Sequence, residues 1–199
     1  KILPSDFPDE IYLTIDVEDY FQVAAFADIV APGDWDDMEP RLQLNLLSIL
    51  VLLKKYKVHA TFFVVGWIAE KYPDLIREVI SCGHEIGCHS YWHRKIYDLT
   101  PEEFREDTVK AKEALERISG RKVTAYRAPS YSITKESLWA LDILKEAGFT
   151  TDSSIFPIRH DFYGIPDAPR FRHSLPAQGI DEFPISTAVL FGRKIPVSG

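Results

Sequence analysis

Val58-His59-Ala60-Thr61-Phe62-Phe63-Val64-Val65 is the segment of this chain with the densest run of β-branched and aromatic residues. Such a run, without polar alternation, is typical of a strand that is buried on both faces. Leucines spaced three and four apart predict a helix over 41–56 before it. Residues 67–81 predict another helix after it, with Gly83 as its stop. A buried strand between two helices is the repeating unit of an α/β protein.

The same unit recurs along the chain. Thr100-Pro101-Glu102-Glu103 is a typical helix start, with a Thr cap, Pro at the first helical position and Glu three residues after the cap. Strand and helix alternate five times, which predicts parallel strands with helices outside. The further strands expected are 11–15, 84–88, 123–127, 149–151 and 180–184, and the further helices are 100–118 and 134–147.

Length and composition predict one globular domain. The 199 residues are 46% hydrophobic and 27% charged, with a net charge of -7 that disfavours nucleic acid as a partner. No segment approaches the ~20 apolar residues of a membrane span. A complete eight-unit barrel takes about 250 residues. We therefore expect residues 1–199 to form a single catalytic domain that lacks its last elements.

The chain ends also inform the expected compartment. The sequence begins at Lys1 rather than Met, so we expect that an upstream segment has been removed. Cys82 and Cys88 fit no zinc or redox spacing and are expected to be free thiols. These features favour the cytoplasm and leave the cell envelope open. Nothing in the sequence indicates an oligomeric state.

Two histidines, His89 and His93, suggest a metal site. Four residues apart, they would lie on one face of a helical turn and reach a single ion. The acidic cluster after the first strand, Asp16, Glu18 and Asp19, offers a third ligand. Two histidines and one carboxylate leave coordination positions open, as hydrolytic metal sites do.

Three motifs in order give the chain a family resemblance. They are Thr14-Ile15-Asp16-Val17-Glu18, His89-Ser90-Tyr91-Trp92-His93 and Arg127-Ala128-Pro129-Ser130-Tyr131. In these motifs the chain resembles the polysaccharide deacetylases (carbohydrate esterase family four, the NodB-like domain). The resemblance implies a distorted (β/α) barrel of about seven strands, here incomplete at its C-terminus. It also implies a divalent metal, with zinc expected, and an enzyme that removes N-acetyl groups from the amino sugars of a polysaccharide.

The first motif departs from the family's adjacent pair of aspartates. The second acid is displaced to Glu18, which resembles the subgroup of some peptidoglycan deacetylases and allantoinase-like enzymes. Because residues two apart on an extended chain project to the same side, Asp16 and Glu18 would both face the site. Glu18 is therefore the expected metal carboxylate, with Asp19 as the alternative.

The resemblance also implies roles for other residues. Asp16 would be the general base, Arg127 would pair with it, and the backbone N–H of Tyr131 would hold the oxyanion. Asp152 would orient the arginine or a general acid, with a turn cap as an equal alternative. The family's late histidine acid does not match His160 or His173, so we expect it beyond Gly199.

Two other functions stay open at this point. One is an allantoinase-like hydrolase of a small cyclic amide, which the Asp16-Val17-Glu18 arrangement and the Asp152-Ser153-Ser154 segment suggest. The other is a catalytically inactive, carbohydrate-binding relative. The presence of both histidines, the acids and Arg127 argues against an inactive relative, because a role in binding alone does not require these residues.

Overall fold

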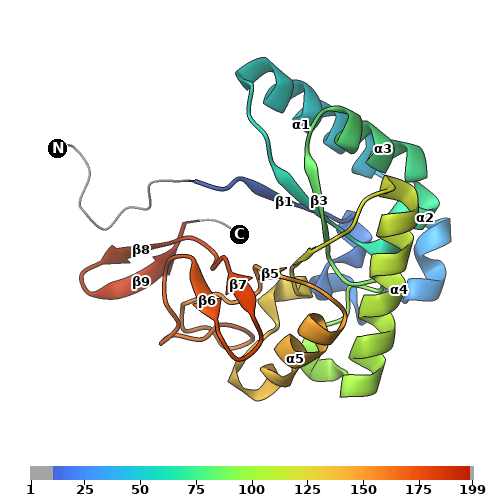
Figure 1. The fold of residues 1–199 in the computed structure, drawn as a ribbon. Helices are drawn as coiled ribbons and strands as arrows, with labels where there is room; N and C mark the ends of the chain where they lie inside the picture. Colours follow the sequence, from blue (N-terminus) through green and yellow to red (C-terminus); the bar gives the residue numbers. More distant parts are fainter. Residues whose placement is uncertain (1–10, 198–199) are drawn as a thin grey trace.

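The computed structural model describes residues 11–197 and shows a seven-stranded sheet covered by helices. The strand order is β1-β2-β3-β4-β5-β7-β6, and every pairing in this sheet is parallel except that of β6 with β7. The helices α1 to α5 lie along the outside of the sheet (Figure 1). The α/β class predicted from the alternating pattern is confirmed.

The element bounds follow the predicted alternation. The strands of the main sheet are β1 (Thr14–Val17), β2 (Thr61–Val64), β3 (Glu85–Cys88), β4 (Ala125–Tyr126), β5 (Thr151–Asp152), β6 (His173–Leu175) and β7 (Ile180–Glu182). The helices are α1 (Leu42–Tyr56), α2 (Gly66–Lys71), α3 (Pro73–Ser81), α4 (Pro101–Ser119) and α5 (Trp139–Glu146). Helix α4 begins with the predicted Thr100–Glu103 capping box and ends at Gly120, whose φ is 66°.

Several predicted segments differ from the structure. The strand expected over 11–15 is β1 at Thr14–Val17, and the helix expected over 134–147 is a 3-10 helix (Lys135–Ser137) followed by α5. The helix expected over 67–81 is split into α2 and α3 at Tyr72, because Pro73 cannot continue a helix and restricts the residue before it. The long loop expected before residue 180 contains strand β6, which pairs antiparallel with β7. A hairpin of β8 (Thr187–Leu190) and β9 (Arg193–Pro196) follows, and its turn has positive φ at Phe191 and Gly192.

The order of the first five strands is that of a barrel. Strands β1 to β5 are adjacent in sequence order, whereas a doubly wound sheet reverses direction at a switch point. The described pairings of residues 11–197 leave β1 and β6 as the two edges of the sheet, without closure between them. In the same range, none of the helices has the length and apolar character needed to traverse a bilayer.

The strand order brings the chemistry to one edge of the sheet. Parallel strands in register place their carboxyl ends together, so the residues that follow β1, β3, β4 and β5 meet there. Central strand residues such as Phe62 and Val64 are fully buried against the helices. The sheet core thereby fixes the positions of the polar residues that follow each strand.

Candidate functional site

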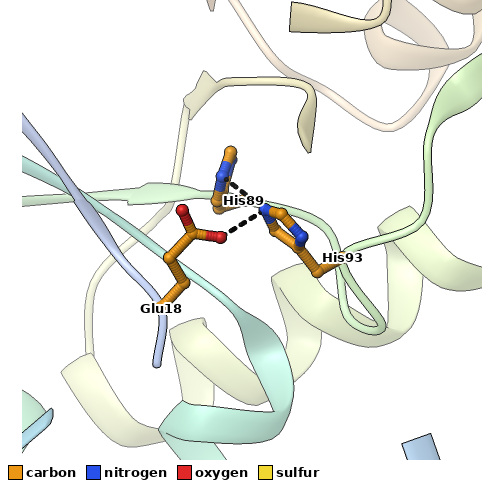
Figure 2. Close-up of side chains that lie close together, drawn as sticks. All are labelled: Glu18, His89 and His93. Carbon is orange, nitrogen blue, oxygen red and sulfur yellow. Dashed lines mark hydrogen bonds and ion pairs between the residues drawn. The ribbon is translucent and has the colours of Figure 1, made fainter. Parts of the chain in front are cut away.

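Three side chains converge at this edge of the sheet: Glu18, directly after β1, and His89 and His93, after β3 (Figure 2). The Nε2 atoms of the two histidines lie 3.2 Å apart, and His93 Nε2 lies 2.6 Å from Glu18 Oε2. Both histidines are buried, while the Glu18 side chain is 25% exposed. One ligand atom from each residue falls within 4.8 Å of the others, which defines a candidate metal triad.

The chemistry of the triad fits a divalent cation. Glu18 Oε2 is buried without a hydrogen-bond partner among the described residues, because its short contact with His93 lacks hydrogen-bond geometry. A tetrahedral zinc with bonds of about 2.0 Å holds its ligand atoms about 3.3 Å apart, close to the separation of the two Nε2 atoms. The contact between Glu18 Oε2 and His93 Nε2 is shorter, at 2.6 Å. Two imidazoles and one carboxylate are also a known catalytic zinc set.

The protonation of His89 is set by the main chain. Its Nδ1 lies 2.8 Å from the carbonyl oxygen of Arg127, which can only accept a hydrogen bond. Nδ1 therefore carries the hydrogen and Nε2 keeps the free lone pair that a metal requires. Burial, outweighing the attraction of Asp16, lowers the pKa of His89 and favours this neutral form.

Residues 89–93 form a loop, so the prediction that they form a helical turn is wrong. Ser90 and His93 have positive φ values of 58° and 53°. Asp107 of α4 accepts hydrogen bonds from the backbone N–H groups of Tyr91, at 2.6 Å, and Trp92, at 3.2 Å. Ser90 Oγ accepts another from the N–H of His93 at 2.9 Å. These side chains replace the hydrogen bonds of a helical turn and direct both imidazoles to Glu18.

Arg127 and Asp16 form an ion pair beside the triad. An Arg127 Nη atom donates to Asp16 Oδ1 at 2.8 Å, and the other Nη donates to Thr14 and Ser153. Burial raises the pKa of Asp16, but the attraction of His89 and Arg127 outweighs it, so the net pKa is lowered. The guanidinium lies 4.3 Å from the centre of the Phe63 ring. That ring requires glycine at position 87, where a Cβ would lie 2.5 Å from it.

Asp19 faces away from the triad. Its carboxylate accepts hydrogen bonds from the backbone N–H groups of Tyr20, Arg41 and Leu42, at 2.9, 2.8 and 3.0 Å. It therefore caps a short 3-10 helix and the start of α1. Of the two carboxylates that the sequence offered as alternatives, Glu18 is the one placed with the histidines.

Tyr131 lies close to Arg127 in a strained turn. Ser130 and Tyr131 both have a φ of 52°, and the N–H of Tyr131 donates to the carbonyl of Ala128 at 3.1 Å. An oxyanion role for this N–H therefore requires that hydrogen bond to be shared with the substrate. Burial raises the pKa of the Tyr131 hydroxyl, so the side chain stays neutral.

Asp152 has no contact with Glu18, His89 or His93 among the described residues. Among the described residues its side chain contacts Ser154 and Glu182 rather than Asp16 or the histidines. It accepts a hydrogen bond from Ser154 Oγ at 2.6 Å, while Ser153 accepts those of Arg127. Asp152 therefore caps the turn after β5, and the orienting role that the sequence offered for it stays a prediction.

Sequence reasoning missed three residues that support the site: Asp107, Ser153 and Glu182. Each is buried, and each belongs to a segment distant in sequence from the group that it supports. The available signal was an acid on an otherwise apolar face: Asp107 between Phe104 and Ala111 on α4, and Glu182 two residues after Ile180 on β7.

A cavity of about 490 Å³ is lined by Tyr97, residues 134–136 and residues 160–164. Its lining includes His160 and Tyr163, whose rings stack with centroids 3.9 Å apart, and Tyr163 packs on Tyr131 with a centroid distance of 6.1 Å. His160 belongs to this aromatic stack, and His173 lies on β6. Neither of these later histidines contacts the triad in the described part of the chain.

With this geometry established, comparison with known families places the chain. Residues 34–151 match the family model described as polysaccharide deacetylase, which covers more than half of the chain. The chain belongs to the polysaccharide deacetylase family. Residues 153–199 match a second model, described as a domain of unknown function (DUF3473). Strands β5 and β7 pair with each other, so the two matched segments share one sheet.

Several curated relatives are named as deacetylases of peptidoglycan or of chitooligosaccharides. A peptidoglycan-N-acetylglucosamine deacetylase of Bacillus cereus is 30% identical over 143 residues, which cover 65% of this chain and 50% of the relative. The peptidoglycan-N-acetylmuramic acid deacetylase PdaC of Bacillus subtilis is 35% identical over 104 residues, 48% of this chain and 22% of the relative. A chitooligosaccharide deacetylase of Azorhizobium caulinodans is 35% identical over 83 residues, 41% of this chain and 40% of the relative. The chain spans half or less of the length of these relatives.

Solved structures show the same fold. A Mycobacterium smegmatis protein described as a polysaccharide deacetylase superposes with a TM-score of 0.67 at 25% identity, over 88% of this chain and 58% of the other. A peptidoglycan N-acetylglucosamine deacetylase bound to a hydroxamate-type benzamide gives a TM-score of 0.53 at 25% identity, over 74% of this chain and 57% of the other. The polysaccharide deacetylase fold is therefore shown for this chain.

Proposed function

We propose that this protein is a metal-dependent hydrolase that removes N-acetyl groups from amino sugars of a polysaccharide or oligosaccharide. The observation that carries the proposal is the convergence of the Glu18, His89 and His93 ligand atoms beside an Asp16–Arg127 ion pair. Family membership and the deacetylase activities named for the relatives support the same reaction class.

Glu18, His89 and His93 would hold the ion, and zinc is the ion that this donor set favours. A bound Zn²⁺ supplies Lewis acidity toward the acetyl carbonyl and lowers the pKa of a coordinated water. The lone pair of His89 Nε2 is available for this role because the main chain fixes its tautomer.

Asp16 would act as the general base. Arg127 occupies Oδ1, and no described residue donates to Oδ2, so that oxygen is available to take the proton of the attacking water. Its lowered pKa keeps the carboxylate ionised at neutral pH. The N–H of Tyr131 donates to the carbonyl oxygen of Ala128 at 3.1 Å. During the reaction this N–H would donate to the developing oxyanion as well.

The substrate class and compartment belong to the same proposal. A pocket of about 270 Å³ is lined by Asp16 and Glu18, and it offers room for an acetylated sugar beside the proposed base and metal ligand. The free thiols Cys82 and Cys88 support the cytoplasm as the favoured compartment, with the cell envelope as the alternative.

Acetate release from N-acetylglucosamine oligomers tests the proposal. We expect zinc-loaded protein to release acetate, a chelator to stop the release, and Asp16→Asn to lower the rate by at least about 100-fold. Asp28→Asn, a matched change of an exposed aspartate, should leave the rate unchanged. Calorimetry should show that the Asp16 variant still binds zinc, which separates loss of the base from loss of the metal.

The same assay distinguishes the alternatives. Turnover of allantoin in place of the oligomers would identify a cyclic-amide hydrolase. Zinc binding and oligosaccharide binding without acetate release would identify an inactive relative. Acetate release that persists in the Asp16 variant would contradict the proposed role of the base.

A further inference from the structure

Two carboxyl groups, those of Asp152 and Glu182, lie together in the interior of the protein. Asp152 ends β5 and Glu182 ends β7, and the two residues are register partners in the parallel pairing of these strands. Both residues have 0% of their surface exposed. This pair lies outside the metal triad and has no role in the chemistry proposed above.

Two neighbouring buried carboxyl groups do not both ionise, because each charge would lack water and would repel the other. Glu182 is the group that keeps the proton: burial, reinforced by the charge of Asp152, raises its pKa well above the ordinary value. Asp152 is the better acceptor because it also receives hydrogen bonds from the side chain and the N–H of Ser154. Glu182 Oε2 is buried and has no hydrogen-bond partner among the groups that are fixed donors in the described residues, which leaves its O–H to be donated to the register partner Asp152.

The pair holds the turn that follows β5. The N–H of Ile155 donates to Glu182 Oε1 at 3.1 Å. Ser154 Oγ donates to Asp152 at 2.6 Å and accepts from the N–H of Ala128 at 2.8 Å. The middle residue and the last residue of the turn 153–155 are therefore bonded to the carboxyl pair.

The same turn holds the arginine of the site. The carbonyl oxygen of Ser153 accepts from Arg127 Nε at 3.1 Å, and Ser153 Oγ accepts from an Arg127 Nη at 2.7 Å. Arg127 in turn donates to Asp16 at 2.8 Å. Hydrogen bonds and the intervening main chain of residues 153–155 together connect Glu182 to the proposed general base.

We propose that Glu182 is a positioning residue of the active site: as a neutral carboxylic acid it donates a hydrogen bond to Asp152 and holds the turn 153–155 against Arg127. This role rests on the proposed function only in that Asp16 is the base. It assigns a task to the segment matched by the model of unknown function, since Glu182 lies in that segment and Arg127 lies in the deacetylase match. Glutamine can replace the neutral acid, because its amide also donates and accepts.

The protonation state is tested without any activity measurement. Infrared difference spectra at neutral pH should show the carbonyl band of a protonated carboxylic acid in the wild-type protein. Glu182→Gln should remove the band, and Asp181→Asn, an acid on the same strand that is paired with Arg172, should keep it. A wild-type spectrum without the band, or a band that persists in Glu182→Gln, overturns the proposal.

The positioning role is tested at Arg127 itself. We expect Glu182→Ala to shift or broaden the Arg127 Nε–H resonance in ¹H–¹⁵N spectra, assigned with Arg127→Lys, and Glu182→Gln to leave it near its wild-type position. An unchanged resonance in Glu182→Ala overturns the proposal. Glu182→Met, which fills the same volume without polar atoms, replaces the alanine variant if the latter does not fold.

Kinetics then connect this position to the reaction. For acetate release, Glu182→Ala should lower kcat about tenfold or more with KM changed less than about twofold, and Glu182→Gln should retain kcat. Equal kcat values for the wild-type and alanine proteins contradict the positioning role. A wild-type protein that releases no acetate refutes the proposed function instead, and the infrared and resonance results then decide the arrangement around Glu182 independently.

Discussion

Glu18 and Asp19 are adjacent acids with different surroundings. Glu18 points to the histidines, whereas Asp19 accepts three backbone N–H groups at the starts of two helices. The alternation of an extended chain accounts for this division, because neighbouring side chains project to opposite sides. Replacing Glu18 should therefore affect metal binding, whereas replacing Asp19 should affect the free energy of unfolding.

We predict that Glu18→Gln weakens zinc binding at least about 100-fold, with little change in the free energy of unfolding of the metal-free protein, because it removes an anionic ligand. Asp19→Ala should lower that free energy by about 1–2 kcal/mol through the lost cap and leave zinc affinity within about twofold. Calorimetric zinc titration and urea denaturation of the metal-free proteins measure both effects. The reverse pattern would assign the metal carboxylate to Asp19.

A second prediction at this scale concerns pH. The raised pKa of Glu182 means that the folded protein binds its proton more tightly than the unfolded chain does. The resulting stabilisation is complete below the ordinary pKa of 4.5 and is lost as the pH rises toward the folded-state pKa. Glutamine does not titrate, so Glu182→Gln should gain stability relative to wild type between about pH 5 and pH 8.

Urea denaturation at both pH values tests this prediction. Three charged or titratable groups face Glu182 among the described residues. They are Asp152 on β5, Arg127 after β4, and His173 on β6, which is the register partner of Glu182. Asp152, Arg127 and His173 are the same in both proteins, so the comparison isolates the change at Glu182. A stability difference that is independent of pH would contradict a raised pKa at Glu182.

Sequence reasoning reached the residues whose roles depend on local spacing. The Asp16–Glu18 alternation, the histidine pair and Arg127 each follow from a short motif. It did not reach Glu182, because the partner that makes this glutamate informative, Asp152, is thirty positions away and is brought next to it only by strand pairing. Tyr131 was assigned an oxyanion role without the hydrogen bond that already occupies its N–H.

At the scale of elements, α4 and the loop 89–93 act together. Asp107 on α4 holds the backbone of Tyr91 and Trp92, and burial raises the pKa of Asp107 against the opposing effect of those N–H groups. The loop conformation therefore depends on a helix that begins eight residues after it.

We predict that Asp107→Asn weakens zinc binding about tenfold, because an amide can accept one of the two N–H hydrogen bonds but presents a donor to the other. Glu106→Gln, an exposed position next to it on the same helix, is the matched control. Isothermal titration with zinc gives the comparison. An affinity equal to that of wild type would show that the loop keeps its shape without this carboxylate.

Element types were predictable where caps and periodicity were strong, as in α4 with its Thr100–Glu103 box. The short strands were harder to identify. Strand β6 has three residues in a segment rich in Pro and Arg, and it is a strand because β7 lies beside it. The two histidines of the loop 89–93 have the spacing of a helical turn. The N–H groups of Tyr91 and Trp92 nevertheless donate to the distant Asp107 instead of making the hydrogen bonds of a helix.

At the scale of the whole molecule, α1 is apolar on more than one side. Leu46 and Leu50 are buried, but Leu44 and Val51 remain 74% and 69% exposed. Helix α1 precedes β2 and follows β1, an edge strand of the sheet among the described residues. Exposed apolar surface beside an unpaired strand edge favours self-association.

We therefore expect the 199-residue chain to self-associate, and Leu44→Lys with Val51→Lys to reduce this association while changing the free energy of unfolding by less than about 0.5 kcal/mol per site. Gln43→Lys with Ser48→Lys adds the same charge on the same helix without removing apolar surface. Sedimentation velocity over a range of concentrations compares the three proteins. A wild-type chain that stays monomeric throughout would contradict the expectation.

The fold class was predictable because the alternation of strand and helix recurs five times along the chain. An error in one segment therefore leaves the predicted class unchanged. The hairpin β8–β9 was not predictable from that pattern. Its turn places the non-glycine residue Phe191 at a φ of 50°, a conformation that the sequence does not signal. Whether residues 1–199 act as one catalytic domain stays a prediction, although the shared sheet is consistent with it.

Residue 127 joins the two halves of the chemistry. Its carbonyl oxygen orients His89, and its guanidinium orients Asp16. One amino acid therefore sets the spacing between the imidazole proposed to bind the metal and the proposed proton acceptor, because its main chain fixes the first and its side chain fixes the second. A substitution at position 127 therefore perturbs the orientation of His89 and of Asp16 together.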